Sequence, residues 1–269
     1  MKKAVKTVLD GMGVLEPAQH LYFNIRTASP SILARELRSR LFSPPDDLPL
    51  PPPELIFDVI GCRWAAVYLD SGARIVEDMR GILARNGYEV GDFESVLDFG
   101  CGCGRLIRHL HQVLTRLHGS DYNPHLIAWC QQSLGFARFT TNALHPPLPY
   151  EGQTFDFIYA RSVLTHLTEA LQHEWMAELH RVLKPEGLLY VTTHGRPLTS
   201  GLSETHKAAF EAGQLVVTFP QVAGENLCST YESRVFVETE LLDGFDLVDF
   251  VEGRPSVHLR QDVYLLRKH

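Results

Sequence analysis

Residues 96–105, VLDFGCGCGR, combine one carboxylate with three closely spaced glycines after a short apolar run. Asp98 lies two residues before Gly100, and Gly102 and Gly104 follow at every second position. Glycine lets a backbone approach a ligand closely and adopt left-handed dihedral angles, so a strand ending in this turn can bind a ligand through its main chain. A carboxylate at Asp98 would repel a pyrophosphate but attract the cationic amino group of an amino-acid-like ligand.

The same turn can be compared with the dinucleotide fingerprint G-x-G-x-x-G. Gly100 and Gly102 fit its first two glycines, but the last position is Arg105. A side chain of that size obstructs the close helix–strand packing that the third glycine serves. An NAD-dependent dehydrogenase is therefore a disfavoured alternative.

A second carboxylate, Asp121, follows 23 residues after Asp98, at the end of the next apolar strand. An acidic residue at that place can accept hydrogen bonds from both ribose hydroxyls of an adenosine. One carboxylate for an amino group and one for a ribose together suit S-adenosylmethionine (SAM).

Four segments resemble the class I SAM-dependent methyltransferases, and the resemblance runs from about Asp92 to His194. They are VLDFGCGCGR (96–105), GSDYN (119–123), FDFIYARSVLTHL (155–167) and ELHRVLKPEGLLYVTTHG (178–195). The resemblance implies a roughly seven-stranded sheet with an antiparallel final strand. Asp58–Gly61, Tyr68–Gly72 and Arg260–Val263 are also similar to a branch that modifies small molecules, natural products or glycans.

The resemblance implies a cofactor-binding set of eleven residues. It comprises Asp98, Gly100, Cys101, Gly102, Arg105, Asp121, Tyr122, Asn142, Ala143, Arg161 and Ser162. In this set the two glycines line the methionine part, Tyr122 packs beside the adenine, and Arg161 with Ser162 borders the methyl-transfer site. Asn142 takes the position that hydrogen-bonds the adenine ring, where many relatives carry Asp; an amide oxygen can still accept from the adenine amino group.

Three residues are candidates for catalysis at the acceptor. His166 follows the fourth strand at the carboxyl edge of the sheet, where a histidine can remove a proton near neutral pH. It can equally cap the next helix or pack against the cofactor. His194, at the end of the fifth strand, is the second candidate, and Tyr231 could hydrogen-bond the acceptor.

The elements that must position these residues alternate between strand and helix. The expected strands are Ser95–Phe99, Leu117–Asp121, Ala137–Thr141, Phe155–Ala160 and Leu188–Thr193, with helices at Gly72–Asn86, Gly104–Leu117, Asn123–Gly135 and Thr168–Leu183. Such alternation is typical of right-handed βαβ units and a mostly parallel sheet covered on both faces. The fold class is thus α/β, a Rossmann-like doubly wound sheet.

The C-terminal part has a different pattern. A helix at Ser203–Gly213 is followed by expected strands at Leu215–Phe219, Ser233–Val237, Phe245–Val251 and Val263–Leu266. The last two can form an antiparallel hairpin at the sheet edge. Residues 195–233 are too long for a simple connection and are expected to be an insertion that walls the acceptor pocket.

The N-terminal part is expected to be a separate helical segment. Ser29-Pro30 is a typical helix start, and Ser43–Pro53 is rich in proline, which fixes φ and removes backbone donors. We therefore expect a helical segment with its linker at residues 1–53, either covering the acceptor pocket or packing on the core. The methyltransferase domain is expected at residues 54–269.

Composition restricts the partners. The 269 residues carry a formal net charge of -7, which argues against a nucleic-acid partner because phosphate binding needs a cationic surface. No apolar run is long enough for a membrane span, and no secretory signal is apparent. Five cysteines without framework spacing indicate a reducing compartment, the cytoplasm, with neither a disulfide nor a metal site.

The function expected from these observations is methyl transfer to an oxygen or nitrogen atom of a small molecule, with a sugar or secondary metabolite among the candidates. A regulatory or interaction module that binds SAM without turnover is the alternative. The acceptor, the methylated atom and the oligomeric state do not follow from the sequence.

Overall fold

The computed structural model describes residues 46–114, 116–254 and 260–269. The chain divides into two compact units, residues 1–70 and 71–269. The helix expected over residues 1–42 lies outside the described residues. In the first unit, the proline-rich residues 47–52 have no regular structure, and α4 (Pro53–Ile60) ends at Gly61, whose φ of 69° is left-handed. The expected domain boundary at residue 53 stays a prediction.

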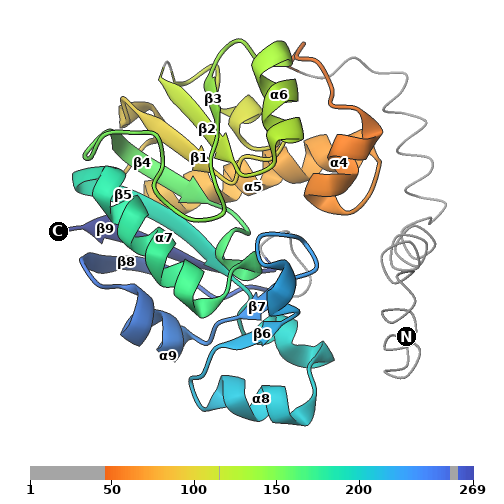
Figure 1. The fold of residues 1–269 in the computed structure, drawn as a ribbon. Coiled ribbons are helices and arrows are strands. Elements are labelled where there is room, and N and C mark those ends of the chain that lie inside the picture. Colours follow the sequence, from red (N-terminus) through yellow and green to blue (C-terminus); the bar gives the residue numbers. More distant parts are fainter. Residues whose placement is uncertain (1–45, 115, 255–259) are drawn as a thin grey trace. The chain divides into compact units, whose positions relative to one another are not determined.

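The second unit is built on a seven-stranded sheet in the order β3-β2-β1-β4-β5-β9-β8 (Figure 1). Its strands are β1 (Val96–Phe99), β2 (Leu117–Asp121), β3 (Arg138–Thr141), β4 (Phe155–Ala160), β5 (Leu183–Thr193), β8 (Phe245–Val251) and β9 (Asp262–Lys268). The pairs among the first five strands are parallel, whereas β9 is antiparallel to both β5 and β8. The expected α/β class and the expected antiparallel C-terminal strand are confirmed.

The strand order reverses direction between β1 and β4, which are both paired in parallel. In open α/β sheets, ligands bind outside the carboxyl ends of the strands at such a reversal point. The glycine-rich turn follows β1 and the Arg161–His166 segment follows β4, so both segments lie at this edge.

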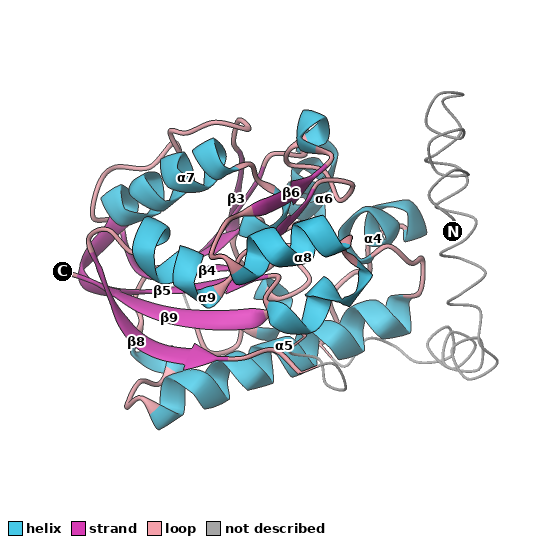
Figure 2. Ribbon diagram, turned by 90° about the horizontal axis from the view of Figure 1, so that it is seen from below, coloured by secondary structure: helices cyan, strands magenta, loops and turns pink. Residues whose placement is uncertain are grey.

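Helices cover both faces of the sheet. α7 (Glu169–Val182) and α9 (Arg234–Phe236) lie on one face, and the part of α5 (Ala65–Arg85) from Ser71 onward lies on the other (Figure 2). α6 (Pro124–Ser133) packs on β2 and β3 and is capped by Asn123, whose side chain accepts from the His125 amide at 3.0 Å. The core under α7 includes Trp175 and aliphatic side chains of the central strands.

Two expected elements are wrong. Residues 104–114 form turns and a 3-10 helix (Ile107–His109), with mostly i to i+3 hydrogen bonds, instead of an α-helix. Leu106, Ile107 and Leu110 are still buried, as their spacing indicated. The spacing of apolar residues determines which side of the segment faces the sheet. It does not determine whether each amide bonds to the third or the fourth preceding carbonyl. The expected strand Ser233–Val237 is helical, with α9 followed by a π-helical turn (Val237–Leu241), because the Ser233 side chain caps it by accepting from the Phe236 amide.

Other differences concern boundaries. α5 begins at Ala65, seven residues before the expected start, and β5 begins at Leu183, five residues before the expected start. The expected insertion at residues 195–233 contains α8 (Glu204–Glu211) and a separate antiparallel pair, β6 (Val216–Thr218) and β7 (Ser229–Tyr231). Strand β7 was not expected from the sequence.

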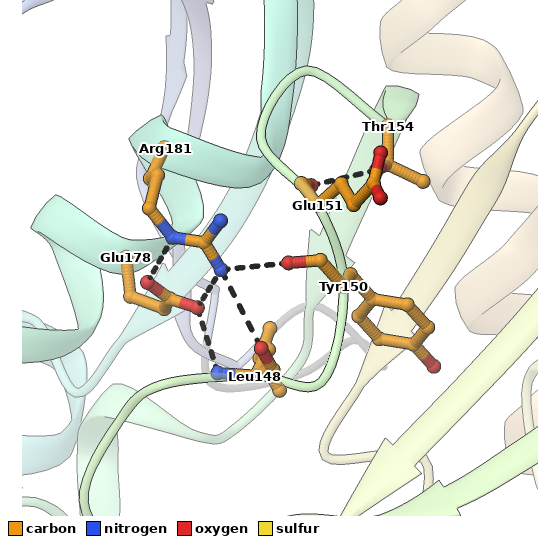
Figure 3. A network of polar contacts seen from close by, with 6 residues as sticks. All are labelled: Leu148, Tyr150, Glu151, Thr154, Glu178 and Arg181. Atoms are coloured by element: carbon orange, nitrogen blue, oxygen red, sulfur yellow. Dashed lines mark hydrogen bonds and ion pairs between the residues drawn. The ribbon is translucent and has the colours of Figure 1, made fainter.

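The loop after β3 is held to α7 by a polar network (Figure 3). Glu178 accepts from the Leu148 amide at 2.7 Å and pairs with Arg181 at 2.6 Å, and Arg181 also donates to the Tyr150 carbonyl at 2.9 Å. Trp175, one turn earlier on α7, donates from its indole to the Leu144 carbonyl at 2.9 Å. These bonds anchor residues 144–150, directly after Asn142 and Ala143.

Candidate functional site

The turn after β1 needs glycine for two separate reasons. Gly100, Gly102 and Gly104 have φ values of 77°, 56° and 79°, a region that other residues rarely adopt. A Cβ on Gly100 would also lie 2.3 Å from Cγ2 of Val163. The amides of Gly100 and Cys101 donate to the Ser120 carbonyl at 2.7 and 3.0 Å, so the turn is tied to the end of β2.

Asp98 is buried beneath this turn, and its Oδ2 has no hydrogen-bond partner among the described residues. Burial is the main reason that its pKa rises to about 8; the Tyr159 hydroxyl and the Arg105 guanidinium lower it only in part. A buried carboxyl with an unused oxygen is costly in the absence of a ligand. A cationic amino group would supply both the missing donor and the compensating charge.

Asp121, at the end of β2, is also buried. Its two oxygens accept from the backbone amides of Gly102 at 2.8 Å and Asn123 at 2.9 Å. These two bonds fix the plane of the carboxylate, and each oxygen retains a second acceptor position. Burial raises the pKa of Asp121, and the backbone donors lower it in part.

The residues near Asp121 form a small group of hydrogen-bonded polar residues. The Asn142 side chain accepts from the Ser120 hydroxyl at 2.5 Å and donates to the Ala143 carbonyl at 2.7 Å. The Tyr122 ring is 39% exposed, which leaves a face for an aromatic ligand. The insertion comes close to these residues at Gly224, where a Cβ would lie 3.7 Å from Cζ of Tyr122.

The cysteines of the turn are packing residues. Cys101, Cys103 and Cys130 are buried and form no disulfide, and the Cys101 and Cys130 thiols both point to the Gly102 carbonyl, at 3.6 and 3.5 Å. Within residues 46–114, 116–254 and 260–269 no group of three or more His, Cys, Asp or Glu side chains could hold a metal ion. Arg105 donates to the Ser71 hydroxyl at 3.4 Å.

The three candidate catalytic residues lie together although they are far apart in the sequence. The ring centroids of His166 and His194 are 6.2 Å apart, and those of His194 and Tyr231 are 5.4 Å apart. Residues 164–166 form a 3-10 turn after β4, His194 follows β5, and β7 packs against the 3-10 turn. The insertion thus places Tyr231 at the carboxyl edge of the sheet.

The backbone of residues 228–230, at the start of β7, orients both histidines. Nδ1 of His166 lies 2.7 Å from the Cys228 carbonyl, and Nδ1 of His194 lies 3.0 Å from the Thr230 carbonyl. A carbonyl can only accept, so Nδ1 carries the proton in each ring and Nε2 of the neutral ring is an acceptor. Burial lowers both pKa values, that of His194 to about 3, where His166 and Arg161 add charge repulsion.

Arg161 and Ser162 connect β4 to the ends of β5 and β9. The Ser162 amide donates to Oγ1 of Thr192 at 2.8 Å, and Thr192 donates to Oε1 of Gln261 at 2.7 Å. Gln261 returns a bond from Nε2 to the Ser162 hydroxyl at 2.8 Å, and Arg161 donates to Thr192 at 3.3 Å. Ser162 has a φ of 62°, a strained value for serine that this network holds in place.

Comparison with known proteins agrees with this geometry. Residues 97–191 match the family model described as a methyltransferase domain. An uncharacterized methyltransferase of Synechocystis sp. is 28% identical over 104 residues, which cover 39% of this chain and 49% of that protein. The chain thus spans about half the length of the curated relative that it matches.

The sequence match places residues 97–191 in a methyltransferase-domain family, in agreement with the resemblance to the class I SAM-dependent methyltransferase superfamily. Solved structures share its fold. A SAM-dependent methyltransferase from Leishmania major is 14% identical, with 81% of each chain covered and a TM-score of 0.55. A protein from Pyrococcus horikoshii is 16% identical, with 76% of this chain and 95% of that chain covered and a TM-score of 0.54.

SAM is the cofactor of this superfamily, and the residues present fit it. The unused oxygen of Asp98 suits its amino group, and the bare backbone at Gly100 permits close approach. Tyr122, Asn142 and Ala143 lie at the ends of β2 and β3, next to Asp121, as expected for an adenosine site.

The sequence did not point to Glu232, a fully buried carboxyl beside the two histidines. It accepts from Nε2 of Gln172 at 2.7 Å and from the His194 amide at 3.1 Å. Burial raises its pKa to about 8, so it holds a proton at neutral pH. The only sequence signal was its position next to Tyr231.

Proposed function

We propose that this protein transfers the methyl group of SAM to an oxygen or nitrogen atom of a small-molecule acceptor. One observation carries the acceptor part of this proposal. Two neutral histidines with Nε2 in the acceptor form lie beside Tyr231, at the sheet edge where the cofactor-binding turn ends. This arrangement can accept a proton from a hydroxyl or an ammonium group.

Each part of the chain has a separate task in this proposal. Asp98 holds the amino group of SAM, Asp121 holds its ribose, and Tyr122 with Asn142 contacts its adenine. SAM supplies an activated methyl group. The chain orients the acceptor, excludes water and takes up the proton that the acceptor loses.

We assign the proton-accepting role to His166 and make His194 the second candidate. The pKa of His166 lies below 6.5 because the ring is largely buried, so the ring is neutral at pH 7. Its Nδ1 hydrogen bond to the Cys228 carbonyl keeps Nε2 unprotonated. His194, with a pKa of about 3, is the weaker base, which suits accepting a hydrogen bond more than holding a proton.

The test is turnover of SAM to S-adenosylhomocysteine (SAH) with a panel of hydroxyl and amine acceptors. We expect His166→Ala to lower kcat by about 10²–10⁴-fold with unchanged SAH affinity. In the parent enzyme, kcat should fall as pH drops through the lowered pKa of His166, since protonation removes the base. The exposed His173→Ala is the matched control.

Two results would contradict the proposal. A fall in SAH affinity proportional to the fall in rate would make His166 a structural residue. SAH binding without turnover of any acceptor would favour the alternative, a regulatory module that binds SAM.

The surroundings of the protein are part of the same proposal. The five cysteines are buried and form no disulfide, which supports a reducing compartment such as the cytoplasm. Among the described residues, no helix is both long enough and apolar enough to cross a membrane. A sugar or secondary metabolite remains among the candidate acceptors.

A further inference from the structure

Arg161 is a cation with an unused donor at the acceptor side of the site. One of its terminal nitrogens donates to Oγ1 of Thr192 at 3.3 Å, but its Nε is shut off from solvent and has no partner among the described residues. The residue as a whole is partly buried. A charged donor left unmatched in such a place costs stability unless a ligand uses it.

The charge of Arg161 is compensated only in part by its surroundings. Burial lowers its pKa to about 10, and repulsion from Arg105 adds to this, while Tyr190 and Asp78 offset the change only in part; the group therefore stays cationic at pH 7. Among the described residues no carboxylate forms an ion pair with it. The buried carboxyls of Asp98 and Glu232, each with a pKa near 8, hold protons at that pH when no ligand is bound.

Arg105 and Arg161 influence different groups of the site. Arg105 is the cation that lowers the pKa of Asp98, where the amino group of SAM belongs. Arg161 instead lowers the pKa of His194, in the acceptor cluster. Its bond to Thr192 directs it towards β5 and away from β1. The charge of Arg161 thus acts on the acceptor cluster.

The Arg161 side chain is also held in position in advance. The Thr192 hydroxyl accepts from Arg161 and from the Ser162 amide, and donates to Gln261. All positions of that hydroxyl are filled, so it cannot rotate to serve another group. A guanidinium fixed in this way suits a planar anion that takes two parallel N–H bonds.

We propose that Arg161 binds a carboxylate of the methyl acceptor, so that the acceptor is a small carboxylic acid. This inference rests on the proposed function. The carboxylate pairs with the Nε edge of Arg161, and the hydroxyl or amine to be methylated lies towards His166 and His194.

Calorimetry on the full-length protein loaded with SAH tests this, with benzoate as the carboxylate probe and benzamide as its neutral counterpart. We expect benzoate to bind at least about tenfold tighter than benzamide. Arg161→Gln should abolish the difference, Arg161→Lys should keep part of it, and the exposed Arg138→Gln should keep all of it. SAH affinity should change less than about threefold in Arg161→Gln. The Lys variant retains the charge and so guards against a folding defect.

Equal binding of the two probes, or a preference that survives in Arg161→Gln, would overturn the inference. A loss of SAH affinity of about tenfold or more in that variant would also overturn it, because the anion would then be the cofactor's own carboxylate. Methyl transfer is measured separately by SAH formation. If no acceptor is turned over while the Arg161-dependent preference persists, the anion site stands and the proposed methyl transfer falls.

Discussion

Replacing Asp98 with asparagine should stabilise the ligand-free protein and weaken cofactor binding at the same time. The carboxyl has a pKa of about 8 in the folded chain, against an ordinary value of 3.8, mainly because it is buried. Between these two values the folded state holds more protons than the unfolded state. The free energy of unfolding therefore falls as pH rises, by about 1.4 kcal/mol per pH unit.

The full effect is reached above pH 8, where it amounts to at most about 6 kcal/mol. Asparagine has no proton to lose, so Asp98→Asn should raise the Tm of the ligand-free protein clearly at pH 8 and much less at pH 5. The measurement is thermal unfolding followed by circular dichroism at both pH values.

Cofactor binding should respond in the opposite way, because the amino group needs the ionised carboxylate. A group with a pKa of about 8 is about 1% ionised at pH 6 and half ionised at pH 8. SAH affinity of the parent protein should therefore rise roughly fiftyfold between these values. In Asp98→Asn the affinity should be lower, with no such rise.

The matched control is Asp156→Asn, since Asp156 pairs with Lys184 at 2.6 Å and accepts from the Ser95 amide at 2.7 Å. Loss of that carboxylate should lower the Tm. If Asp98→Asn also lowered the Tm at pH 8 and kept the pH slope of SAH binding, the reasoning about burial and the amino group would be refuted.

Three further predictions follow from the site. Gly100→Ala should lose SAH binding or fold poorly, since its φ is 77° and its Cβ would lie 2.3 Å from Val163; calorimetry and Tm check this, and unchanged values of both would contradict it. Glu232→Gln should retain stability at pH 7 and raise the Tm at pH 9, because the parent carboxyl loses its proton near pH 8 at a cost; a lower Tm at pH 9 would show that the ionised form is needed. Cys101→Ser should leave the metal content of the purified protein unchanged, and loss of stoichiometric zinc or iron would refute a packing role.

The fold could be predicted because its elements are coded locally. The ranges of β2 and β4 agree with the expected strands residue for residue, and Asn123 caps α6 as a side-chain acceptor should. The chain after Gly104 could not be assigned in the same way. An apolar stripe is satisfied by an α-helix or by tighter turns, and the choice depends on the three left-handed glycine positions before it.

Asp98 and Asp121 lie on adjacent strands of one sheet, as the sequence indicated, and their roles in binding SAM stay predictions. For the acceptor part of the site, the sequence indicated the separate residues but not that they lie together. His166 and Tyr231 are 65 positions apart in the sequence, and no periodicity relates them. Glu232 was missed because a single acidic residue is usually exposed to solvent, and nothing in the sequence indicates that this one is buried.

The insertion at residues 195–233 does more than form a wall of the acceptor pocket, which is the role that the sequence suggested. The two carbonyls that set the tautomers of His166 and His194 belong to Cys228, which directly precedes β7, and to Thr230, within β7. One short backbone segment of the insertion thus orients both rings. Because the family match covers residues 97–191 and β7 lies outside it, the cofactor half comes from the shared domain. Under the proposed function, the proton-accepting geometry comes from residues 195–233, so a change in that segment would alter the acceptor chemistry without disturbing SAM.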